Sequence, residues 1–399
     1  MRFPARSALR VFCNKILVSL RGLVCNVTPS LIEQGVPKRF CAISNGAFPQ
    51  KFRVSNRADK TIFLTKAFVA VYVAVSVSAP KTNILSAAGL RLVQLANDRL
   101  VASFLPELGA KMSSLKSVST GREFLLQPPD RPYRQATYGA RFADFDTSGF
   151  DECCPTVSEC QYPTGEFAGA VMPDHGDLWS TAWLCEIGDS ELHFEARGTS
   201  LPYVLHKHVS LESNAIILRY EIESTGSREF AFLWSAHPLL AVEPGCRIVL
   251  PSEVSSVFVN CSREERLGKY GDGCGWPVAR TTGGGEVNLA ELTTVNAHTA
   301  DKLFTSRLSE GECAFSYPYS DELVFQFDPL LVPYLGIWIC QGGWPSPDHG
   351  HFTVALEPCT GRPDSLRESI KMGECDVLQP GQTKTWELRL EVRSGQLSK

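Results

Sequence analysis

Three short polar clusters in the sequence carry the residue types that proton-transfer chemistry needs. His175 lies in residues 173–179, His237 follows the apolar run 232–236, and Glu357 follows the apolar run 352–356. A carboxylate at the end of a buried strand is partly desolvated, which raises its pKa and makes it a better base near neutral pH. Alone, each cluster is a weak signal, since a single His in a strand is more often structural and a Glu closing a strand is usually solvated.

Aromatic side chains near these clusters suit a sugar, because pyranose C–H faces stack on aromatic rings. Trp338 and Trp344 precede the Glu357 run, and Trp179 lies four residues after His175. Packing in the core explains each tryptophan equally well. Gln341 is a candidate hydrogen-bonding partner for a sugar hydroxyl.

The clusters are embedded in short segments of alternating polarity that predict β-strands. Ile216, Leu218, Tyr220 and Ile222 share one strand face, as do Trp386, Leu388, Leu390 and Val392. Turn sequences rich in Gly and Pro separate such segments, and no long helical periodicity is present. We therefore predict an all-β fold for residues 86–399, a large antiparallel β-sandwich.

Residues 1–85 differ from this pattern and are predicted to be an extension outside the sandwich. Residues 1–60 contain eleven Lys and Arg against two acids, and an apolar run at 67–77 precedes small residues. That run is too short for a comfortable transmembrane helix. A targeting segment, a weak membrane anchor and a disordered upstream extension all remain open for this part of the chain.

Composition narrows the partners and the compartment. The net charge of −4 provides no electrostatic case for nucleic acid or for an acidic membrane surface. Fourteen cysteines without a C-x-x-C motif in a chain of this size favour free thiols in a reducing compartment. We expect a cytoplasmic protein without stable membrane association, or alternatively one sent to an organelle or exported through its N-terminal segment.

Taken in order, the motifs Asp174-His175-Gly176, Ala236-His237-Pro238 and Leu356-Glu357-Pro358 resemble those of the aldose 1-epimerase superfamily, also called galactose mutarotase-like. Residues 106–115 resemble the opening hairpin of that family, and the resemblance covers roughly residues 88–395. Imperfect matches elsewhere indicate a divergent branch. The resemblance implies a galactose mutarotase-like sandwich and an isomerase that interconverts the α- and β-anomers of an aldose.

Roles for individual residues follow from the same resemblance. Glu357 would be the general base at the anomeric hydroxyl, His237 the general acid at the ring oxygen, and His175 a hydrogen-bonding partner of the sugar. Arg141 and Asp272 would bind sugar hydroxyls, with Asp301 as an alternative to Asp272. No metal or organic cofactor is implied, because the sugar contains its own leaving oxygen.

Two other functions fit the same sequence. The first is a non-catalytic carbohydrate-binding module, because related sandwiches serve as accessory domains. The second is an enzyme of the same fold that acts on another carbohydrate. A sugar phosphate would require a cationic cluster, for which Lys302 and Arg362 are candidates. The sequence leaves open which sugar binds and which oligomer forms.

Overall fold

The structure is a computed structural model. It describes residues 79–394 except 88, 129–131, 319–320 and 347–349, together with four short strands nearer the N-terminus. It divides into two compact units, Met1–Val77 and Ser78–Lys399. In the first unit β1 (Ala8–Cys13), β2 (Ile16–Arg21), β3 (Phe52–Asn56) and β4 (Thr61–Leu64) form a four-stranded antiparallel sheet in that order. The apolar run at 67–77 lies outside the described residues.

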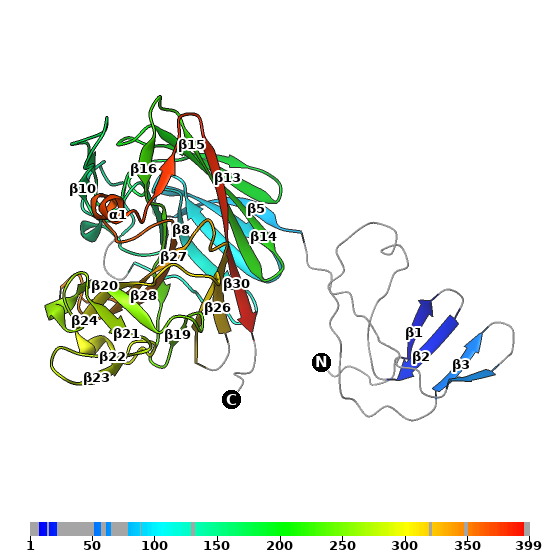
Figure 1. Cartoon of the computed structure of the whole chain (residues 1–399). Helices are drawn as coiled ribbons and strands as arrows, with labels where there is room; N and C mark the ends of the chain where they lie inside the picture. The colour runs from blue at the N-terminus through cyan, green and yellow to red at the C-terminus, as the bar shows by residue number, and fades with distance from the viewer. Residues whose placement is uncertain are drawn as a thin grey trace. The chain divides into compact units, whose positions relative to one another are not determined.

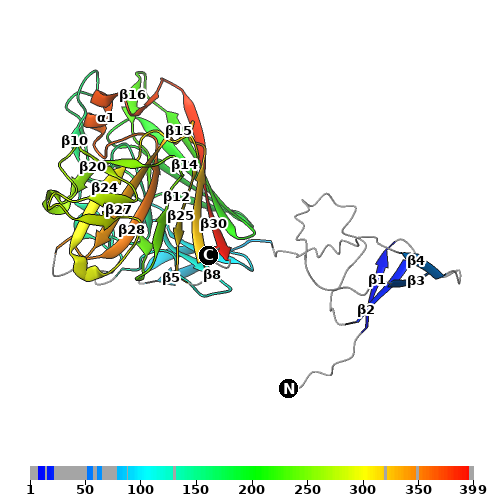
Figure 2. The same ribbon diagram turned by 60° about the horizontal axis from the view of Figure 1, so that its bottom comes forward.

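The second unit is built from two large antiparallel sheets. In Figures 1 and 2, β24, β27 and β28 gather on one side of this unit and β14, β15 and β30 on the other. The twelve-stranded sheet has the order β21 (Gly273–Gly275), β20 (Ser256–Ser262), β24 (Thr299–Phe304), β27 (Tyr334–Gln341), β28 (Phe352–Cys359), β17 (Ser235–Pro238), β9 (Phe150–Cys153), β8 (Lys111–Ser117), β7 (Leu100–Leu105), β6 (Leu90–Ala96) and β5 (Lys81–Ala87), with β18 (Leu240–Ala241) also paired to β28. The eight-stranded sheet has the order β12 (Leu184–Ile187), β13 (Glu191–Arg197), β14 (Tyr203–Glu212), β15 (Ala215–Ser224), β30 (Thr383–Ser394), β26 (Asp321–Phe327), β25 (Glu312–Ser316) and β19 (Arg247–Val249).

The apolar faces of these sheets form one core between them, as the alternating sequence predicts. In β15 and β30 the two predicted faces meet directly, because Tyr220 lies opposite Trp386 and Leu218 lies opposite Leu388. All four side chains are buried. The predicted large antiparallel β-sandwich is therefore confirmed.

Smaller elements complete the described part of the second unit. Its one α-helix, α1 (Leu366–Met372), follows β28. No helix among the described residues is long and apolar enough to cross a membrane. The eleven described cysteines are all unbridged. The remaining elements are three two-stranded sheets, β10 (Cys160–Gln161) with β11 (Val171–Met172), β16 (Phe230–Phe232) with β29 (Asp376–Leu378) and β22 (Val278–Arg280) with β23 (Glu286–Asn288), and the 3-10 turns η2 (Phe142–Asp144), η3 (Arg263–Glu265) and η4 (Val295–Ala297).

A buried ion pair joins the two sheets through the core. Lys207 of β14 donates to Glu152 of β9 at 2.9 Å, and both side chains are 1% exposed. The hydroxyl of Tyr220 donates to the same carboxylate at 3.0 Å. Since β-strand side chains alternate, Glu152 points into the core while its neighbour Asp151 points to the opposite face of the sheet.

We expect Lys207→Met to destabilise the protein by about 3–5 kcal/mol, because it leaves the buried Glu152 carboxylate without a counter-charge. Urea unfolding followed by circular dichroism measures the loss. Lys371→Met is the matched control, since Lys371 pairs with Glu368 on the surface and such pairs contribute little. Equal midpoints for the two variants would contradict this account.

Candidate functional site

The three predicted catalytic residues meet at the outer face of the twelve-stranded sheet, where β28 and β17 are paired neighbours. Ser235 of β17 lies opposite Cys359 of β28. His237 and Glu357, each two residues away from that pair, project from the same face because strand side chains alternate. Neither sequence position alone determines this face; it follows from the register between the strands.

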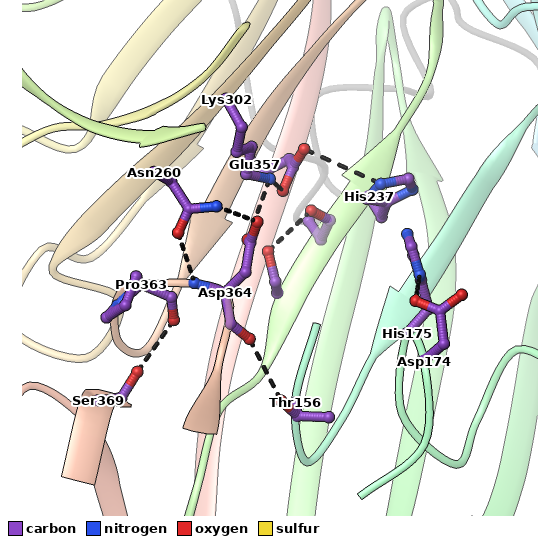
Figure 3. A network of polar contacts seen from close by, with 12 residues as sticks. Thr156, Asp174, His175, His237, Asn260, Lys302, Glu357, Pro363, Asp364 and Ser369 are labelled. Atoms are coloured by element: carbon purple, nitrogen blue, oxygen red, sulfur yellow. Dashed lines mark hydrogen bonds and ion pairs between the residues drawn. The ribbon is translucent and has the colours of Figure 1, made fainter. Parts of the chain in front are cut away.

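His237 and Glu357 point toward each other on this face (Figure 3), with 4.0 Å between Nε2 of the imidazole and Oε1 of the carboxylate. His175, which comes from the loop after β11, packs edge-on against His237 with 4.9 Å between ring centroids. Glu357 is fully buried and His237 nearly so, whereas the His175 side chain is 18% exposed. The three side chains form one contiguous cluster that solvent reaches at His175.

Lys302 of β24 contacts the second oxygen of Glu357 and is the direct counter-charge of that carboxylate. The Lys302 ammonium is also 3.4 Å from the carboxylate of Asp364, which follows β28. Asn260 of β20 donates to Asp364 at 2.9 Å, as Figure 3 shows. Glu357, Lys302 and Asp364 are all buried, so solvent screens the charges of this network weakly.

Burial shifts the proton affinities of the two facing groups in opposite directions. Burial raises the pKa of Glu357, although Lys302 opposes the shift and Asp364 adds to it. Burial lowers the pKa of His237 well below its usual value, and His175, Lys302 and Lys111 lower it further. In the free protein at neutral pH, His237 is therefore a neutral imidazole.

The loop that carries His175 is fixed from several sides. The Asp174 carboxylate lies 2.8 Å from Nδ1 of His175 and accepts the backbone N–H of Phe142 at 2.9 Å. The Phe142 ring stacks on the imidazole with 4.1 Å between centroids. His175 itself has a φ of 58°, a left-handed conformation that costs energy for a residue with a side chain and is characteristic of functional sites.

The residue after His175 is a glycine that packs directly against the backbone of Cys154. Gly176 has a φ of 75°, and a Cβ at this position would lie 2.2 Å from the carbonyl oxygen of Cys154. The N–H of Asp177 donates to that same carbonyl at 2.7 Å. The His-Gly pair seen in the sequence thus has a steric reason, because only glycine lets the loop approach Cys154, directly after β9, so closely.

A second buried lysine flanks the site on the side of β9. Lys111 lies 2.8 Å from Asp151 and 2.7 Å from Asp146. Asp151 is the cross-strand neighbour of His237, and burial raises the pKa of Asp151 to about 6 even though Lys111 opposes that shift. The facing pair of His237 and Glu357 therefore lies between two lysine–carboxylate clusters.

The predicted tryptophans lie around this cluster. Trp179 packs edge-on against Phe142 with 5.2 Å between centroids and donates its indole N–H to the Asp174 carbonyl. Trp344 packs against the same group of side chains as Phe142. Trp338 packs edge-on against Trp344 with 6.0 Å between ring centroids, and it lies opposite Lys302 in the sheet. Trp179 is 5% exposed, so its observed role is to support the loop that carries His175.

The other residues predicted to bind sugar hydroxyls are Gln341, Asp272 and Arg141, and their contacts differ from those of the three central residues. The Gln341 side-chain oxygen accepts from the backbone and hydroxyl of Thr293 at 2.8 and 2.9 Å. Asp272 is exposed and accepts a backbone N–H within a surface turn. The alternative to it, Asp301, is buried in an ion pair with Arg266. Arg141 is exposed beside Asp174, at the solvent side of the His175 loop.

Sequence reasoning missed four residues that shape the site: Lys302, Lys111, Phe142 and Asp364. Lys302 was considered only as a phosphate ligand. The available signal was a lysine next to apolar residues, as in Lys302-Leu303-Phe304, because such a residue is buried only with a partner. Lys111 gave the same signal after Gly109-Ala110.

Two further features of the described residues bear on function. No group of three or more His, Cys, Asp or Glu side chains among them is arranged to hold a metal ion. A hollow of about 700 Å³ lies over the eight-stranded sheet, where Arg219, Leu331 and Trp386 are among the lining residues. None of its lining residues belongs to the cluster around Glu357.

We expect Gly176→Ala to displace the His175 loop and to lower the melting temperature by several degrees, because the new methyl group overlaps the Cys154 carbonyl. Gly169→Ala is the matched control: Gly169 also has a positive φ, of 86°, but has nothing within 4 Å of the added carbon. Differential scanning calorimetry compares the two. A smaller loss for Gly176→Ala than for Gly169→Ala would show that the close approach does not matter.

Comparison with solved structures identifies the fold. No family model matches the sequence, and no curated protein matches it. Among solved structures, a galactose mutarotase-like protein from Lactobacillus casei is 17% identical with a TM-score of 0.56, over 76% of this chain and 100% of that one. A galactose mutarotase-like protein from Clostridium acetobutylicum is 13% identical with a TM-score of 0.56, over 79% and 99%. An aldose epimerase homologue from C. elegans is 13% identical with a TM-score of 0.50, over 80% and 100%. These similarities agree with the resemblance in the sequence motifs, and the chain has the galactose mutarotase-like fold.

Proposed function

We propose that this protein is an aldose 1-epimerase-like enzyme that interconverts the anomers of an aldose, with Glu357 and His237 as its base and acid. The observation that carries the proposal is the pair of facing atoms, Glu357 Oε1 and His237 Nε2, at 4.0 Å. Among the described residues neither Glu357 Oε1 nor His237 Nδ1 has a hydrogen-bond partner. Buried polar atoms are normally satisfied, so Glu357 Oε1, which faces His237 Nε2, is the carboxylate oxygen left for a ligand.

The reaction needs two proton transfers at oxygens bonded to one carbon. Glu357 takes the proton of the anomeric hydroxyl while the bond between C1 and the ring oxygen breaks, and His237 gives a proton to that ring oxygen. Rotation about C1–C2 turns the aldehyde, and the same transfers in reverse close the ring on its other face. Glu357 and His237 then regain their starting states, so no other reactant is consumed.

The remaining residues of the cluster fit supporting roles. His175 is exposed enough to meet the sugar and is oriented by Asp174. Trp338 and Trp344 are half-buried and offer ring faces or edges beside Lys302 and Phe142. A non-catalytic sugar-binding module would need the aromatic rings but would have no use for a fully buried, charged carboxylate.

We expect Glu357→Gln to reduce catalysed anomer exchange by about 10²-fold or more, because an amide cannot take the hydroxyl proton. Saturation-transfer NMR on candidate aldohexoses measures exchange between the two anomeric proton signals. Glu387→Gln makes the same chemical change at an exposed ion pair with Arg219 and should leave the rate unchanged. Exchange in Glu357→Gln as fast as in the wild type would refute the assignment.

The pH dependence of kcat/KM should reflect the shifted groups of the free enzyme. Catalysis needs His237 protonated and Glu357 ionised, and the pKa of His237 is lowered while that of Glu357 is raised. Above both pKa values the protonated imidazole is lost, so kcat/KM should fall close to tenfold per pH unit on the alkaline side of the profile. Below them, protonation of Glu357 removes the base, which gives a bell-shaped profile.

Rates corrected for the uncatalysed reaction at each pH provide this test. His237→Gln should have a low rate that lacks the fall on the alkaline side. A flat wild-type profile across neutral pH would mean that His237 is not the proton donor.

A further inference from the structure

The two oxygens of the Glu357 carboxylate have different surroundings. Oε2 is in contact with the Lys302 ammonium, whereas Oε1 has no hydrogen-bond partner among the described residues and faces His237. Glu357 is 0% exposed and Lys302 is 4% exposed. A carboxylate removed from water this completely would take up a proton unless a positive charge lay beside it.

We propose that Lys302 is a positioning residue, which holds Glu357 as an anion through Oε2 and leaves Oε1 as the oxygen that receives the proton. This inference rests on the proposed function of Glu357 as a base. Lys302 does not touch the reacting atoms in this account. It acts through Glu357, and Asp364 holds its ammonium from the other side.

Asp364 is well anchored for this purpose. Its carboxylate accepts from Asn260 at 2.9 Å, and its backbone carbonyl accepts the N–H groups of Val157 and Ser158 at 2.9 and 3.0 Å. The Lys302 ammonium therefore lies between two carboxylates whose positions are set by the strands and by the segment after β28. Its own pKa is raised, because Asp364 and Glu357 outweigh the effect of burial.

Charge balance separates this role from that of a phosphate ligand. One ammonium faces two carboxylates, so the cluster of Lys302, Glu357 and Asp364 has no net positive charge to offer an anion. Arg362, the other cation considered for a sugar phosphate, is paired with Glu374 and donates to the Thr305 carbonyl. A phosphate group at either cation would have to displace a carboxylate.

The space around Glu357 also explains why Lys302 approaches from β24. Gly336 of β27 is paired with Glu357 on one side and with Phe304 of β24 on the other, and Lys302 is two residues before Phe304 on the same face of β24. A Cβ at Gly336 would lie 3.2 Å from Glu357 Oε2. The absent side chain leaves room for the ammonium to reach the carboxylate across β27.

Within the described part of the chain, six titratable or charged groups surround Glu357 and bear on its titration. They are Lys302 of β24, Asp364 after β28, His237 of β17, His175 of the loop after β11, and the buried thiols Cys153 of β9 and Cys359 of β28. Lys302 lowers the pKa of Glu357 and Asp364 raises it, so single isosteric or length-matched substitutions at these two positions should shift that pKa in opposite directions.

The pKa of Glu357 can be measured directly on the full chain labelled with 13C at glutamate carboxyls. The Glu357 signal is the one missing from Glu357→Gln. In Lys302→Met the pKa of Glu357 should rise by about one unit or more, because the counter-charge is gone. In Asp364→Asn it should fall, because a neighbouring negative charge is gone. Lys302→Arg keeps the charge and should stay close to the wild type.

Opposite shifts in these two variants support the positioning role, since general loosening of the site would move both in the same direction. An unchanged Glu357 titration in Lys302→Met, or a rise in Asp364→Asn, would overturn the inference. If Lys302→Met does not fold, the direction of the shift in Asp364→Asn decides.

Activity separates this inference from the proposed function. In Lys302→Met the acid side of the kcat/KM profile should move to higher pH together with the pKa of Glu357. Anomer exchange without any shift in titration would overturn only the role of Lys302. A shifted titration in a protein that shows no anomer exchange would overturn the proposed function.

Discussion

A negative charge buried in a β-sandwich needs a positive partner, and this requirement organises the centre of the structure. Glu357 is fully buried, and its only direct cationic contact among the described residues is Lys302. Leaving either partner unpaired is expensive inside a protein. The strand β24 must therefore lie where its lysine reaches across β27, and that arrangement leaves the other carboxylate oxygen facing His237.

The two sheets make this arrangement possible by separating two kinds of interior. Between the sheets lies an apolar core, crossed by the ion pair of Lys207 and Glu152. On the outer face of the twelve-stranded sheet lie the histidines and the lysine–carboxylate clusters. Alternation along single strands assigns neighbouring residues to these two environments, as Asp151 and Glu152 show. The loop with His175 lies against this outer face, where His175 packs against His237 and Gly176 packs against Cys154.

The sequence was sufficient to predict the sandwich, and the three residues that its motifs single out lie together in the structure. Alternation in residues 216–222 and 386–392 specified buried strand faces without any long-range information. His175, His237 and Glu357 were found because short local motifs surround each of them. Lys302 and Asp364 were not assigned to the site, because their contacts with Glu357 depend on strand register and on a loop, which no local pattern encodes.

Other residues that the sequence singled out as sugar ligands have protein contacts of their own in the structure. Gln341 and Trp179 are predicted to contact a sugar; in the structure Gln341 accepts the backbone N–H of Thr293, and the Trp179 indole N–H donates to the carbonyl of Asp174. Asp272 lies in an exposed turn. A polar or aromatic side chain has the same appearance in a sequence whether it binds a ligand or satisfies its own backbone, and only the folded contacts distinguish the two.

A crystal structure of Glu357→Gln with an aldohexose would test the central claim most directly. The account predicts one pyranose on the outer face of the twelve-stranded sheet, with its anomeric hydroxyl and ring oxygen each about 3 Å from residue 357 and from His237 Nε2. A sugar bound only elsewhere, such as in the hollow beside Arg219 and Trp386, or one whose reducing end points away from His237, would contradict it.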